Sequence, residues 1–354
     1  MTGIDELYMQ RCLQLARCGA GSTSPNPMVG AVIVCDGRII GEGYHIRAGE
    51  PHAEVNAVNS VSVNDLPLLE RSTMYVTLEP CSHYGKTPPC CDMIIERRIP
   101  RVVIGTTDPN SSVNGAGIER MRAAGIDVKV GVLEKECSRL NRAFFTSQTQ
   151  KRPYVTLKWA QSADGFIDLL REGGQAVKIS TPVSQVAVHR LRAQNDAILV
   201  GRHTALLDNP SLDIRHWAGR APLRLVIDKK GSLPGELKIF DGLLPTVVYT
   251  AAEIDGKFGE NVRQVTLDFE EPLLPQILSH LHTLKVNSLL VEGGATLLQS
   301  FIDASLWDEA RVEVNLSLRL GCGVAAPLFP LDSPDSRENL CGNEILGFYR
   351  QKTP

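Results

Sequence analysis

The fold is decided by Pro51-His52-Ala53-Glu54 and by a second run, Glu79-Pro80-Cys81-Ser82-His83-Tyr84-Gly85-Lys86-Thr87-Pro88-Pro89-Cys90-Cys91. These stretches supply one imidazole, two well-separated thiols and a carboxylate two residues beyond the imidazole. Zinc binds imidazole nitrogen and thiolate sulfur in tetrahedral geometry, and a catalytic zinc keeps one position for water. The pattern therefore predicts a zinc site with His52, Cys81 and Cys90 as ligands. Glu54 is expected to act as an acid/base beside the metal without binding it.

Length and composition limit the class of protein. With 354 residues the chain is too long for one ordinary core, so we expect two domains. The hydrophobic share of 43% and the charged share of 22% are typical of soluble globular proteins. A net charge of −3 gives no general attraction to nucleic acid or anionic membrane, and no apolar run approaches the roughly 18 residues of a membrane span. We therefore expect neither nucleic acid nor membrane as a partner.

The cysteines also indicate a cellular setting. There are nine, an odd number spread along the chain, which argues against a disulfide framework. A reducing cytoplasm is the expected location, where clustered Cys with a nearby His favours a metal site over a disulfide. Residues Met1 to Gln10 are polar and acidic, unlike a signal peptide.

Strand-like and helical patterns alternate along the chain, which favours an α/β fold. Helices are expected at residues 5–18, 52–60, 87–98, 117–124, 181–193 and 295–304. Strands are expected at residues 29–35, 38–44, 73–78, 101–107, 126–131, 155–159, 197–200, 223–227, 246–249, 288–291 and 312–316. The polar stretch from Phe145 to Pro153 is a candidate linker. It would separate a first domain, residues 1–147, from a second domain, residues 153–354.

The first site has the signature of zinc-dependent deaminases, in which His-x-Glu is followed by Pro-Cys-x-x-Cys and the Glu is the general acid/base. Zinc lowers the pKa of bound water toward ~7, so that hydroxide can attack an amidine-like ring carbon. Glu54 would carry the water proton to the ring nitrogen and to the departing amine. Here eight residues separate Cys81 from Cys90 instead of two, and they include Lys86. A cation at this position suggests an anionic substrate such as a phosphate.

Other interpretations of the cysteine-rich run remain open. A structural zinc would need a fourth protein ligand, and His83 is available. Cys91 could replace Cys90 as a ligand, but Cys90 directly follows a proline, as Cys81 does, so we assign Cys91 to core packing. A structural-zinc RNA-binding module is disfavoured by the balanced charge and by the lack of an aromatic and basic stripe.

Four runs carry a resemblance to a known family. They are Ser24-Pro25-Asn26-Pro27-Met28-Val29-Gly30, Gly41-Glu42-Gly43-Tyr44-His45, His52-Ala53-Glu54, and Val76-Thr77-Leu78-Glu79 with its continuation to Cys91. The chain resembles the bifunctional riboflavin-biosynthesis deaminase/reductases. The resemblance implies a cytidine-deaminase-like three-layer domain at the N-terminus that acts on 2,5-diamino-6-ribosylamino-4(3H)-pyrimidinone 5′-phosphate. It also implies that this phosphorylated pyrimidine is contacted by Asn26, His45, His83 and Lys86.

The second half of the chain offers weaker signals of its own. Glu292-Gly293-Gly294 follows an apolar strand and opens a helix, where backbone N–H groups and the helix dipole suit a phosphate or pyrophosphate. Arg192 and Arg215 could bind a phosphate as forks, although a single Arg is more often an ordinary surface residue. Asp164-Gly165 could be only a turn.

In the same family the second half is a dihydrofolate-reductase-like α/β domain that uses NADPH. The resemblance implies that NADPH is held by the backbone near Ala160, by Thr204, by Asp208 and by the Gly294 turn. It implies that the ribosylamino phosphate is held by Arg192, Ser211, Leu212, Arg215 and Glu292. Hydride would go to C1′ of the opened ribose and give a ribitylamino group, with Glu292 or Lys158 handling the accompanying proton.

Two segments depart from the family pattern. Residues Arg171 to Ser180 stand where the family has a Ser-Gly-Glu-Ser-x-Trp-Ile-Thr-like loop, and they lack the Trp, with Lys178 near its place. Ser317-Leu318-Arg319-Leu320-Gly321 stands where the family has Pro-Lys-Leu-Leu-Gly. We therefore keep an alternative in which the chain is a deaminase only, with a C-terminal domain that binds but does not reduce. We also expect a homo-oligomer, either a dimer or a tetramer.

Overall fold

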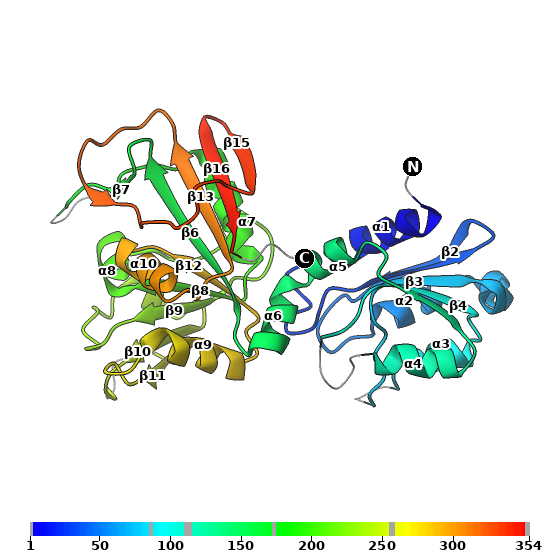
Figure 1. Ribbon diagram of the computed structural model, residues 1–354. Coiled ribbons are helices and arrows are strands. Elements are labelled where there is room, and N and C mark those ends of the chain that lie inside the picture. Colours follow the sequence, from blue (N-terminus) through cyan, green and yellow to red (C-terminus); the bar gives the residue numbers. More distant parts are fainter. Residues whose placement is uncertain (1–2, 85–87, 110–114, 172–174, 255–258, 351–354) are drawn as a thin grey trace. The chain divides into compact units, whose positions relative to one another are not determined.

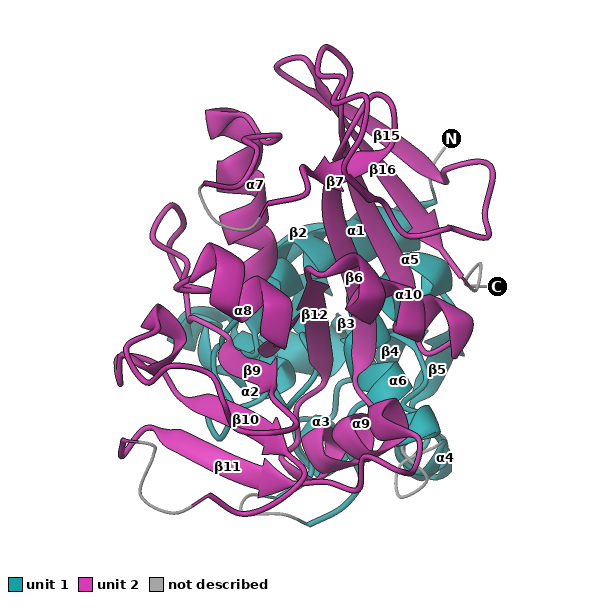
Figure 2. Ribbon diagram, turned by 90° about the vertical axis from the view of Figure 1, so that its left-hand side faces the viewer, with its two compact units in different colours: residues 1–151, 353–354 teal, residues 152–352 magenta. Residues whose placement is uncertain are grey.

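The computed structural model describes residues 3–84, 88–109, 115–171, 175–254 and 259–350. The described chain forms two compact units, one ending at Lys151 and the other beginning at Arg152 (Figure 2). Each unit has its own sheet, flanked by helices, and its own hydrophobic cores. The α/β class predicted from the alternating patterns is therefore confirmed.

The first unit, which runs from blue to green in Figure 1, is built on a five-stranded sheet with the order β2-β1-β3-β4-β5. Its strands are β1 Gly30–Cys35, β2 Arg38–Tyr44, β3 Thr73–Leu78, β4 Arg101–Thr106 and β5 Asp127–Val130. Its helices are α1 Ile4–Arg17, α2 Ala53–Asn59, η1 Val63–Arg71, α3 Cys90–Glu96, α4 Ala116–Ala123, α5 Glu134–Leu140 and α6 Arg142–Gln150. Strand β1 runs antiparallel to β2 and β3, whereas β3, β4 and β5 are parallel.

Successive side chains of β1 point to opposite faces of the sheet, and each face has a core. Ala31 and Ile33 pack with residues of α2, α3 and α4 on one face. Val32 and Val34 pack with residues of α1 and α5 on the other. The first unit is therefore a three-layer structure, as the family resemblance implied.

Close packing brings α2 against β2. A Cβ atom added to Gly43 would lie 2.3 Å from the Ala57 nitrogen and 2.6 Å from the Ala53 carbonyl oxygen. Only glycine leaves room for the helix at this distance. The contact fixes the site because α2 begins directly after His52 and carries Glu54 in its first turn.

The stretch predicted to be a linker contains the division between the two units, but most of it is helical. Residues Arg142–Gln150 form α6, in which Thr146 and Ser147 are buried. Asn141 fixes the start of this helix, because its side chain accepts a hydrogen bond from the Met28 nitrogen at 2.8 Å and donates one to the Met28 oxygen at 2.8 Å. The linker was predicted because the stretch is polar. Some of its polar side chains nevertheless face the interior of the protein, as those of a packed helix do.

The second unit is built, among the described residues, on a nine-stranded sheet with the order β11-β10-β9-β8-β12-β6-β13-β16-β15 (Figure 1). Its strands are β6 Tyr154–Ser162, β8 Ala197–Gly201, β9 Leu223–Ile227, β10 Thr246–Thr250, β11 Val262–Thr266, β12 Ser288–Glu292, β13 Glu309–Asn315, β15 Ser336–Leu340 and β16 Asn343–Tyr349, with a separate pair formed by β7 Phe166–Asp168 and β14 Val324–Ala325. Its helices are α7 Pro182–Ala193, α8 Arg202–Asp208, η2 Lys238–Phe240, α9 Leu273–Thr283 and α10 Ala295–Asp303. The sheet is parallel from β11 to β13 and ends in the antiparallel strands β16 and β15.

The second sheet also has a core on each face. Leu199 and Leu289 pack with residues of α9 and α10. Ile198 and Leu290 pack with Ala205 of α8 and with a residue of η2. The carboxyl ends of β6, β8 and β12 lead into the segments that carry the predicted reductase residues. Open α/β sheets bind their ligands at this end of the strands.

The segment after Leu331 carried no signal in the sequence, yet it completes the sheet. Strands β15 and β16 form a hairpin, and β16 pairs with β13 from Asn343 to Tyr349. The Phe348 ring packs on Phe329 with centroids 4.8 Å apart. The hairpin escaped prediction because β15 is polar and largely exposed, so it shows no apolar alternation.

Most predicted elements are confirmed within a few residues. The strands predicted at 73–78 and 223–227 match β3 and β9 residue for residue. The helix predicted from residue 87 begins at Cys90 as α3, and residue 87 itself lies outside the described residues. Helices α8 and α9 had not been predicted. Within the described ranges, no helix is both long and apolar enough to cross a membrane.

Candidate metal centre and candidate reductase site

Three side chains of the first unit converge on one point. His52 immediately precedes α2, Cys81 lies in the loop after β3, and Cys90 is the first residue of α3. One donor atom from each lies within 4.8 Å of the other two. The Nδ1 atom of His52 is 3.6 Å from Sγ of Cys81 and 3.4 Å from Sγ of Cys90. The structure thus brings the three predicted zinc ligands together.

These distances fit a tetrahedral zinc ion. Bonds of about 2.3 Å to sulfur and about 2.0 Å to nitrogen, at tetrahedral angles, place the two donor atoms about 3.5 Å apart. A hydrogen bond from the Cys90 thiol lowers the pKa of Cys81 to about 4, and the same bond raises the pKa of Cys90. The backbone N–H of Cys90 also donates to Sγ of Cys81 at 3.3 Å. Three such donors leave the fourth position of a zinc ion for water.

Glu54 lies beside the donors without joining them. The residue is 3% exposed, sits in the first turn of α2, and its carboxyl group interacts with the Cys90 thiol. Burial raises the pKa of Glu54 to about 7. The hydrogen bond with Cys81 raises the pKa of His52 to about 9. A carboxyl group next to the open position of the metal is suited to general acid/base chemistry.

A closed structural zinc site finds no fourth ligand in the part of the chain that the structure describes. His83 is exposed and does not belong to the donor group, and no other His, Cys, Asp or Glu of the described residues joins it. Cys91 is fully buried in the core between the sheet and its helices, as predicted. Lys86, predicted to bind substrate, lies outside the described residues.

A second histidine faces the metal donors. The ring of His45 lies edge-on to that of His52, with centroids 5.5 Å apart, and the residue is 2% exposed. Burial lowers the pKa of His45, so the ring is neutral. Its Nδ1 must donate to the Pro51 carbonyl at 3.1 Å, so its Nε2 accepts from Nδ2 of Asn26, also at 3.1 Å. Asn26 and His45, both predicted to contact substrate, thus lie beside the metal donors.

Glu79, for which no role was predicted, holds the segment that carries Cys81. It is 4% exposed. Its carboxylate accepts backbone hydrogen bonds from Asp108 at 3.3 Å, Gly115 at 3.0 Å and Gly117 at 3.1 Å. These bonds tie the residues before Cys81 to the start of α4. Glu79 could have been found because it is an acidic residue that directly follows an apolar strand. A carboxylate buried at such a position needs hydrogen-bond partners.

In the second unit, Arg192 and Glu292 form a two-pronged ion pair. Nε and Nη2 of Arg192 donate to the two oxygens of Glu292 at 3.0 and 2.7 Å, and the side chains are 13% and 11% exposed. Burial opposes ionisation of Glu292, but Arg192 outweighs it and lowers the pKa, so Glu292 is ionised. Lys158 lies opposite Glu292 on the neighbouring strand β6. The structure thus brings these three predicted residues together.

The two predicted phosphate-binding arginines meet at Asp213, which had been assigned no role. The Asp213 carbonyl accepts from Nη1 of Arg192 at 3.1 Å, and its carboxylate accepts from Nη1 of Arg215 at 2.5 Å. Ser211 is half-buried in the same loop. Leu212 is 2% exposed and its side chain packs in the core, which leaves its main chain to contact a substrate.

His189 is another residue that the sequence did not reveal. It lies on α7 three residues before Arg192, and a spacing of three places side chains on the same face of a helix. The residue is 4% exposed, and its Nδ1 is buried without a hydrogen-bond partner among the described residues, 4.0 Å from the Asp213 carboxylate. Burial lowers its pKa. That helical spacing was the signal that could have found it.

The predicted cofactor residues fall into two places. Thr204 of α8 lies against the glycine turn, because a Cβ on Gly293 would be 3.1 Å from its Cγ2 and one on Gly294 would be 3.4 Å from its Oγ1. Both glycines have positive φ, 102° and 72°, which side-chain-bearing residues adopt rarely. This narrow turn before α10 fits a phosphate group of a dinucleotide. Ala160 is on β6, which β12 separates from β8, the strand before α8.

Asp208 is held by the segment that departs from the family pattern. Arg171 pairs with both Asp208 and Asp168, and its side chain is 10% exposed. The same segment is fixed further along, where the Val177 nitrogen donates to Asp168 at 3.0 Å. Lys178 is exposed, and residues 172–174 lie outside the described ranges.

Asp164 does more than form a turn. Its carboxylate accepts from the Ser162 hydroxyl at 2.6 Å and from the backbone nitrogens of Leu320 at 3.1 Å and Gly321 at 2.8 Å. The bond from Ser162, followed by that from Gly321, lowers the pKa of Asp164 to about 2. The second departing segment is thereby tied to the end of β6, the strand that carries Lys158.

The fold and the two sites define a zinc-dependent deaminase joined to a dinucleotide-dependent reductase. Residues 2–106 match the family model for the cytidine and deoxycytidylate deaminase zinc-binding region, and residues 153–333 match that for the RibD C-terminal domain. The chain belongs to the RibD family of riboflavin biosynthesis proteins.

Relatives match along most of their length. The chain is 42% identical to riboflavin biosynthesis protein RibD of Aquifex aeolicus over 309 residues, 86% of this chain and 85% of the relative. It is 38% identical to RibD of Escherichia coli over 326 residues, 88% and 87% of the two chains. The crystal structure of a diaminohydroxyphosphoribosylaminopyrimidine deaminase/5-amino-6-(5-phosphoribosylamino)uracil reductase from Thermotoga maritima superposes with a TM-score of 0.88 at 38% identity and covers 98% of both chains.

The chain is therefore a bifunctional riboflavin-biosynthesis enzyme, a hydrolytic deaminase and an NADPH-dependent reductase, with zinc and NADPH as cofactors. The alternative of a deaminase with an inactive second domain is not favoured, because the family's own C-terminal domain matches the second unit.

Proposed function

We propose that the first unit deaminates 2,5-diamino-6-ribosylamino-4(3H)-pyrimidinone 5′-phosphate. The second unit then reduces the ribosyl group of 5-amino-6-(5-phosphoribosylamino)uracil to ribityl. The activities named for the Thermotoga maritima relative support both substrates. The observation that carries the proposal is the convergence of His52, Cys81 and Cys90 beside the buried Glu54.

In the deamination step, His52, Cys81 and Cys90 hold the zinc ion. Zinc bound there supplies Lewis acidity and lowers the pKa of a water in the open position toward ~7. Glu54 would accept a proton from the attacking water and pass it to the ring nitrogen, and would then take the remaining hydroxyl proton and pass it to the departing amine. Ammonia leaves, and the ring carbon keeps the oxygen as a carbonyl.

Asn26 and His45 bind the pyrimidine in this proposal. Because Nε2 of His45 accepts from Nδ2 of Asn26, the Asn26 side chain is oriented with its carbonyl oxygen available to an amino group. His83 and Lys86 bind the phosphate. Their support is the position of both residues in the run between the two cysteine ligands.

For the reduction step, NADPH is held by Thr204, the Gly294 turn, the backbone of Ala160 and Asp208. NADPH supplies the hydride for C1′ of the opened ribose. The contact between Thr204 and the glycine turn supports this assignment, since the turn is narrow and rich in backbone N–H groups. Arg171 offsets the charge of Asp208, which lets an anionic cofactor approach.

The ribosylamino phosphate is bound by Arg192, Ser211, the main chain of Leu212, Arg215 and Glu292. Lys158 donates the proton that accompanies the hydride. The choice of Lys158 over Glu292 is supported by the ion pair with Arg192, which keeps Glu292 ionised and without a proton to give. Lys158 is well placed because it lies directly opposite Glu292 on β6.

Replacing Glu54 by Gln tests the deaminase proposal. The variant keeps the three zinc donors, so its zinc content should equal that of the wild type. Ammonia release should fall by about 10³-fold, because the amide cannot carry the proton. NADPH oxidation with the deaminated intermediate is the internal control and should be unchanged. Deamination retained at the wild-type rate would contradict the role of Glu54.

A coupled assay tests the reductase proposal. Purified substrate of the deaminase step is incubated with zinc-loaded protein and NADPH, and ammonia and NADPH absorbance are followed together. One NADPH should be consumed for each ammonia released. Accumulation of deaminated product with a flat NADPH absorbance would contradict reduction by the second unit. The Lys158→Met variant should release ammonia without consuming NADPH, whereas the wild-type chain should consume NADPH.

We also propose that the chain forms a homo-oligomer, a dimer or a tetramer, with the family resemblance as its support. Sedimentation equilibrium of the full chain at micromolar concentration would decide this, and a monomer under those conditions would contradict it.

A further inference from the structure

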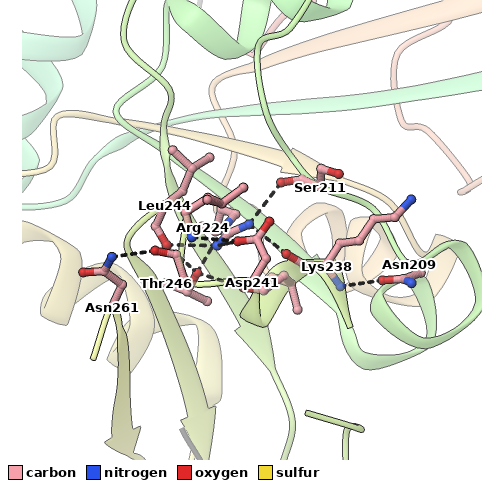
Figure 3. Close-up of polar contacts among 11 residues, drawn as sticks. Asn209, Ser211, Arg224, Lys238, Asp241, Leu244, Thr246 and Asn261 are labelled. Carbon is pink, nitrogen blue, oxygen red and sulfur yellow. Dashed lines mark hydrogen bonds and ion pairs between the residues drawn. The ribbon is translucent and has the colours of Figure 1, made fainter. Parts of the chain in front are cut away.

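Arg224 of β9 is a fully buried cation, at 0% exposure. A guanidinium group has five N–H donors, and burying it is costly unless they are paired. Each donor has an acceptor (Figure 3): Nε on the Thr246 hydroxyl at 3.0 Å, Nη1 on the carbonyls of Ser211 at 3.4 Å and Lys238 at 3.0 Å, and Nη2 on the Asp241 carboxylate at 2.8 Å and the Leu244 carbonyl at 2.9 Å. Arg224 therefore joins several segments that are distant in sequence.

One of those segments is the substrate loop, which we define as residues 209–215. Arg224 reaches it directly through the Ser211 carbonyl. It also reaches it through Lys238, because the carbonyl of Lys238 accepts from Arg224 and its nitrogen donates to Oδ1 of Asn209 at 2.7 Å (Figure 3). The beginning of the loop is thus held on the Arg224 side by two connected contacts.

The backbone of the substrate loop needs such support. Asn209 has φ of 42° and Leu212 has φ of 52°, both in the left-handed region. Residues other than glycine stay in this region only when their surroundings hold them there, and such residues cluster where proteins clamp ligands. Leu212 is a γ-branched residue without a polar group to stabilise the conformation locally. Contacts from outside the loop therefore determine its shape.

The far side of the loop carries the predicted binding groups. Asp213 contacts Arg192 through its carbonyl and Arg215 through its carboxylate. The loop consequently lies between a buried support, centred on Arg224, and the arginines of the reductase site. A shift of the Ser211 carbonyl would move the main chain of Leu212 and the direction of Arg215 together.

We propose that Arg224 is a positioning residue of the reductase. It sets the main-chain position of Ser211 and Leu212 and the aim of Arg215 without touching the substrate. The inference rests on the proposed roles of Ser211, Leu212 and Arg215 in substrate binding. A purely structural Arg224 would instead stabilise the second unit without affecting how the folded protein binds substrate.

The first experiment replaces Arg224 by Lys, which keeps the charge but loses the planar fork. The KM for the deaminated pyrimidine should rise by about tenfold, the size expected for lost hydrogen bonds to a charged group. The KM for NADPH should stay within about twofold, because no hydrogen bond in the described part of the chain joins Arg224 to Thr204 or to the glycine turn. Ammonia release by the same chains reports the amount of enzyme through the first unit, and the unfolding transition of the second unit reports whether the variant is folded. A folded variant with an unchanged substrate KM, and only a lower unfolding midpoint, would overturn the proposal.

A matched pair at Thr246 decides the matter even if Arg224→Lys does not fold. Thr246→Val removes the hydroxyl that accepts from Nε of Arg224 but keeps the volume, whereas Thr246→Ser keeps the hydroxyl. Thr246 is 1% exposed on β10 and lies outside the proposed binding residues. The valine variant should raise the substrate KM by about threefold, and the serine variant should retain the wild-type value. Equal KM values for both variants would overturn the proposal.

Arg215→Gln separates this inference from the proposed function on which it rests. If Arg215→Gln raises the substrate KM while Arg224→Lys and Thr246→Val do not, the positioning role of Arg224 is wrong and the substrate site stands. If Arg215→Gln leaves the substrate KM unchanged, the assignment of the substrate loop itself is wrong.

Discussion

The two sites differ in whether their charged side chains already have partners within the protein. In the first unit, His52, Cys81 and Cys90 direct their donor atoms at one another, and a cation completes the group. In the second unit the proposed binding residues are already paired: Arg192 with Glu292, Arg215 with Asp213, and Asp208 with Arg171. Zinc entering the first site therefore replaces protons held among its own ligands, whereas a phosphate has to compete with carboxylates for its arginines. Ligand affinity in the second site is the difference between new and displaced partners.

The largest expected effect comes from breaking the convergent site. Cys90→Ala removes one of three zinc ligands, so bound zinc should be lost and ammonia release should fall by at least about 10³-fold. Zinc content by atomic absorption and ammonia release measure this. Cys91→Ala is the matched control, because Cys91 is fully buried in the core beside the site. It should keep zinc; loss of zinc from Cys91→Ala alone would reverse the ligand assignment.

Breaking the tightest pair of the second site should have the next largest effect. Glu292→Gln leaves Arg192 without a counter-charge at 13% exposure, so the free energy of unfolding should fall by about 3 kcal/mol. NADPH oxidation should drop by about 100-fold, since a displaced Arg192 misplaces the substrate. Denaturant titration and initial rates measure the two effects.

The control for that experiment is an exposed pair with the same two-pronged geometry. Arg11 donates to both oxygens of Glu42, and its side chain is 42% exposed. Glu42→Gln should lower the free energy of unfolding by less than about 1 kcal/mol, because water screens the pair. Equal losses in Glu42→Gln and Glu292→Gln would mean that burial does not distinguish the two pairs.

The first unit also contains a carboxylate with charged partners, Asp5. The pH dependence of stability measures how much this pairing contributes. Burial opposes its ionisation, but hydrogen bonds from Arg101, Lys129 and Tyr75 outweigh it and lower the pKa of Asp5 from 3.8 to about 2. A lowered pKa stabilises the fold above the unfolded value, and the contribution is lost as pH falls from about 4 to about 2. Asp5→Asn should therefore cost about 2 kcal/mol at pH 7 and much less at pH 2.

The stability difference between Asp5→Asn and wild type, measured by denaturant unfolding at several pH values, tests this. Asp127→Asn is the control, because Asp127 pairs with the same Arg101 but is 73% exposed. It should change stability by less than about 0.5 kcal/mol at every pH. A difference for Asp5→Asn that stays constant down to pH 2 would contradict the lowered pKa.

The smallest expected effect tests whether phosphate must displace a partner. Asp213→Asn removes the charge that holds Arg215, a pair with side chains 57% and 32% exposed. The KM for the deaminated pyrimidine should fall by about two- to fivefold at low salt, and the gain should disappear at high salt. Steady-state kinetics at two ionic strengths measure it. A KM that rises at both would show that Asp213 orients Arg215 more than it competes for it.

The first site could be predicted because its zinc ligands and its acid/base residue lie in short sequence motifs. His52 and Glu54 share one helix start, and each cysteine follows a proline, so residue type and spacing identify ligands and acid/base together. Asn26 and His45 lie in separate segments of the chain, and their link to the site required the family resemblance. Glu79 was missed because its partners are backbone nitrogens, which have no signature in the sequence.

The second site was less predictable because its members are far apart along the chain. Arg192 on helix α7 and Glu292 on strand β12 are 100 residues apart and meet only in the folded unit. Arg224 could not be found at all, since three of its five acceptors are main-chain carbonyls. The stretch predicted to be a linker, which begins at Phe145, contains the division between the units, but its helix was missed because composition does not tell whether a polar side chain faces water or the protein.

The place of β6 in the sheet has a consequence for biosynthesis. It is the first strand of the second unit to leave the ribosome, yet its neighbours are β12 and β13, which begin at Ser288 and Glu309. At translation rates of about 5–20 residues per second, this apolar strand waits on the order of ten seconds for a partner. The first unit, whose strands pair within a shorter span, can complete its sheet during that time. Nascent chains are therefore expected to pass through a state with a finished deaminase and an unpaired, aggregation-prone β6.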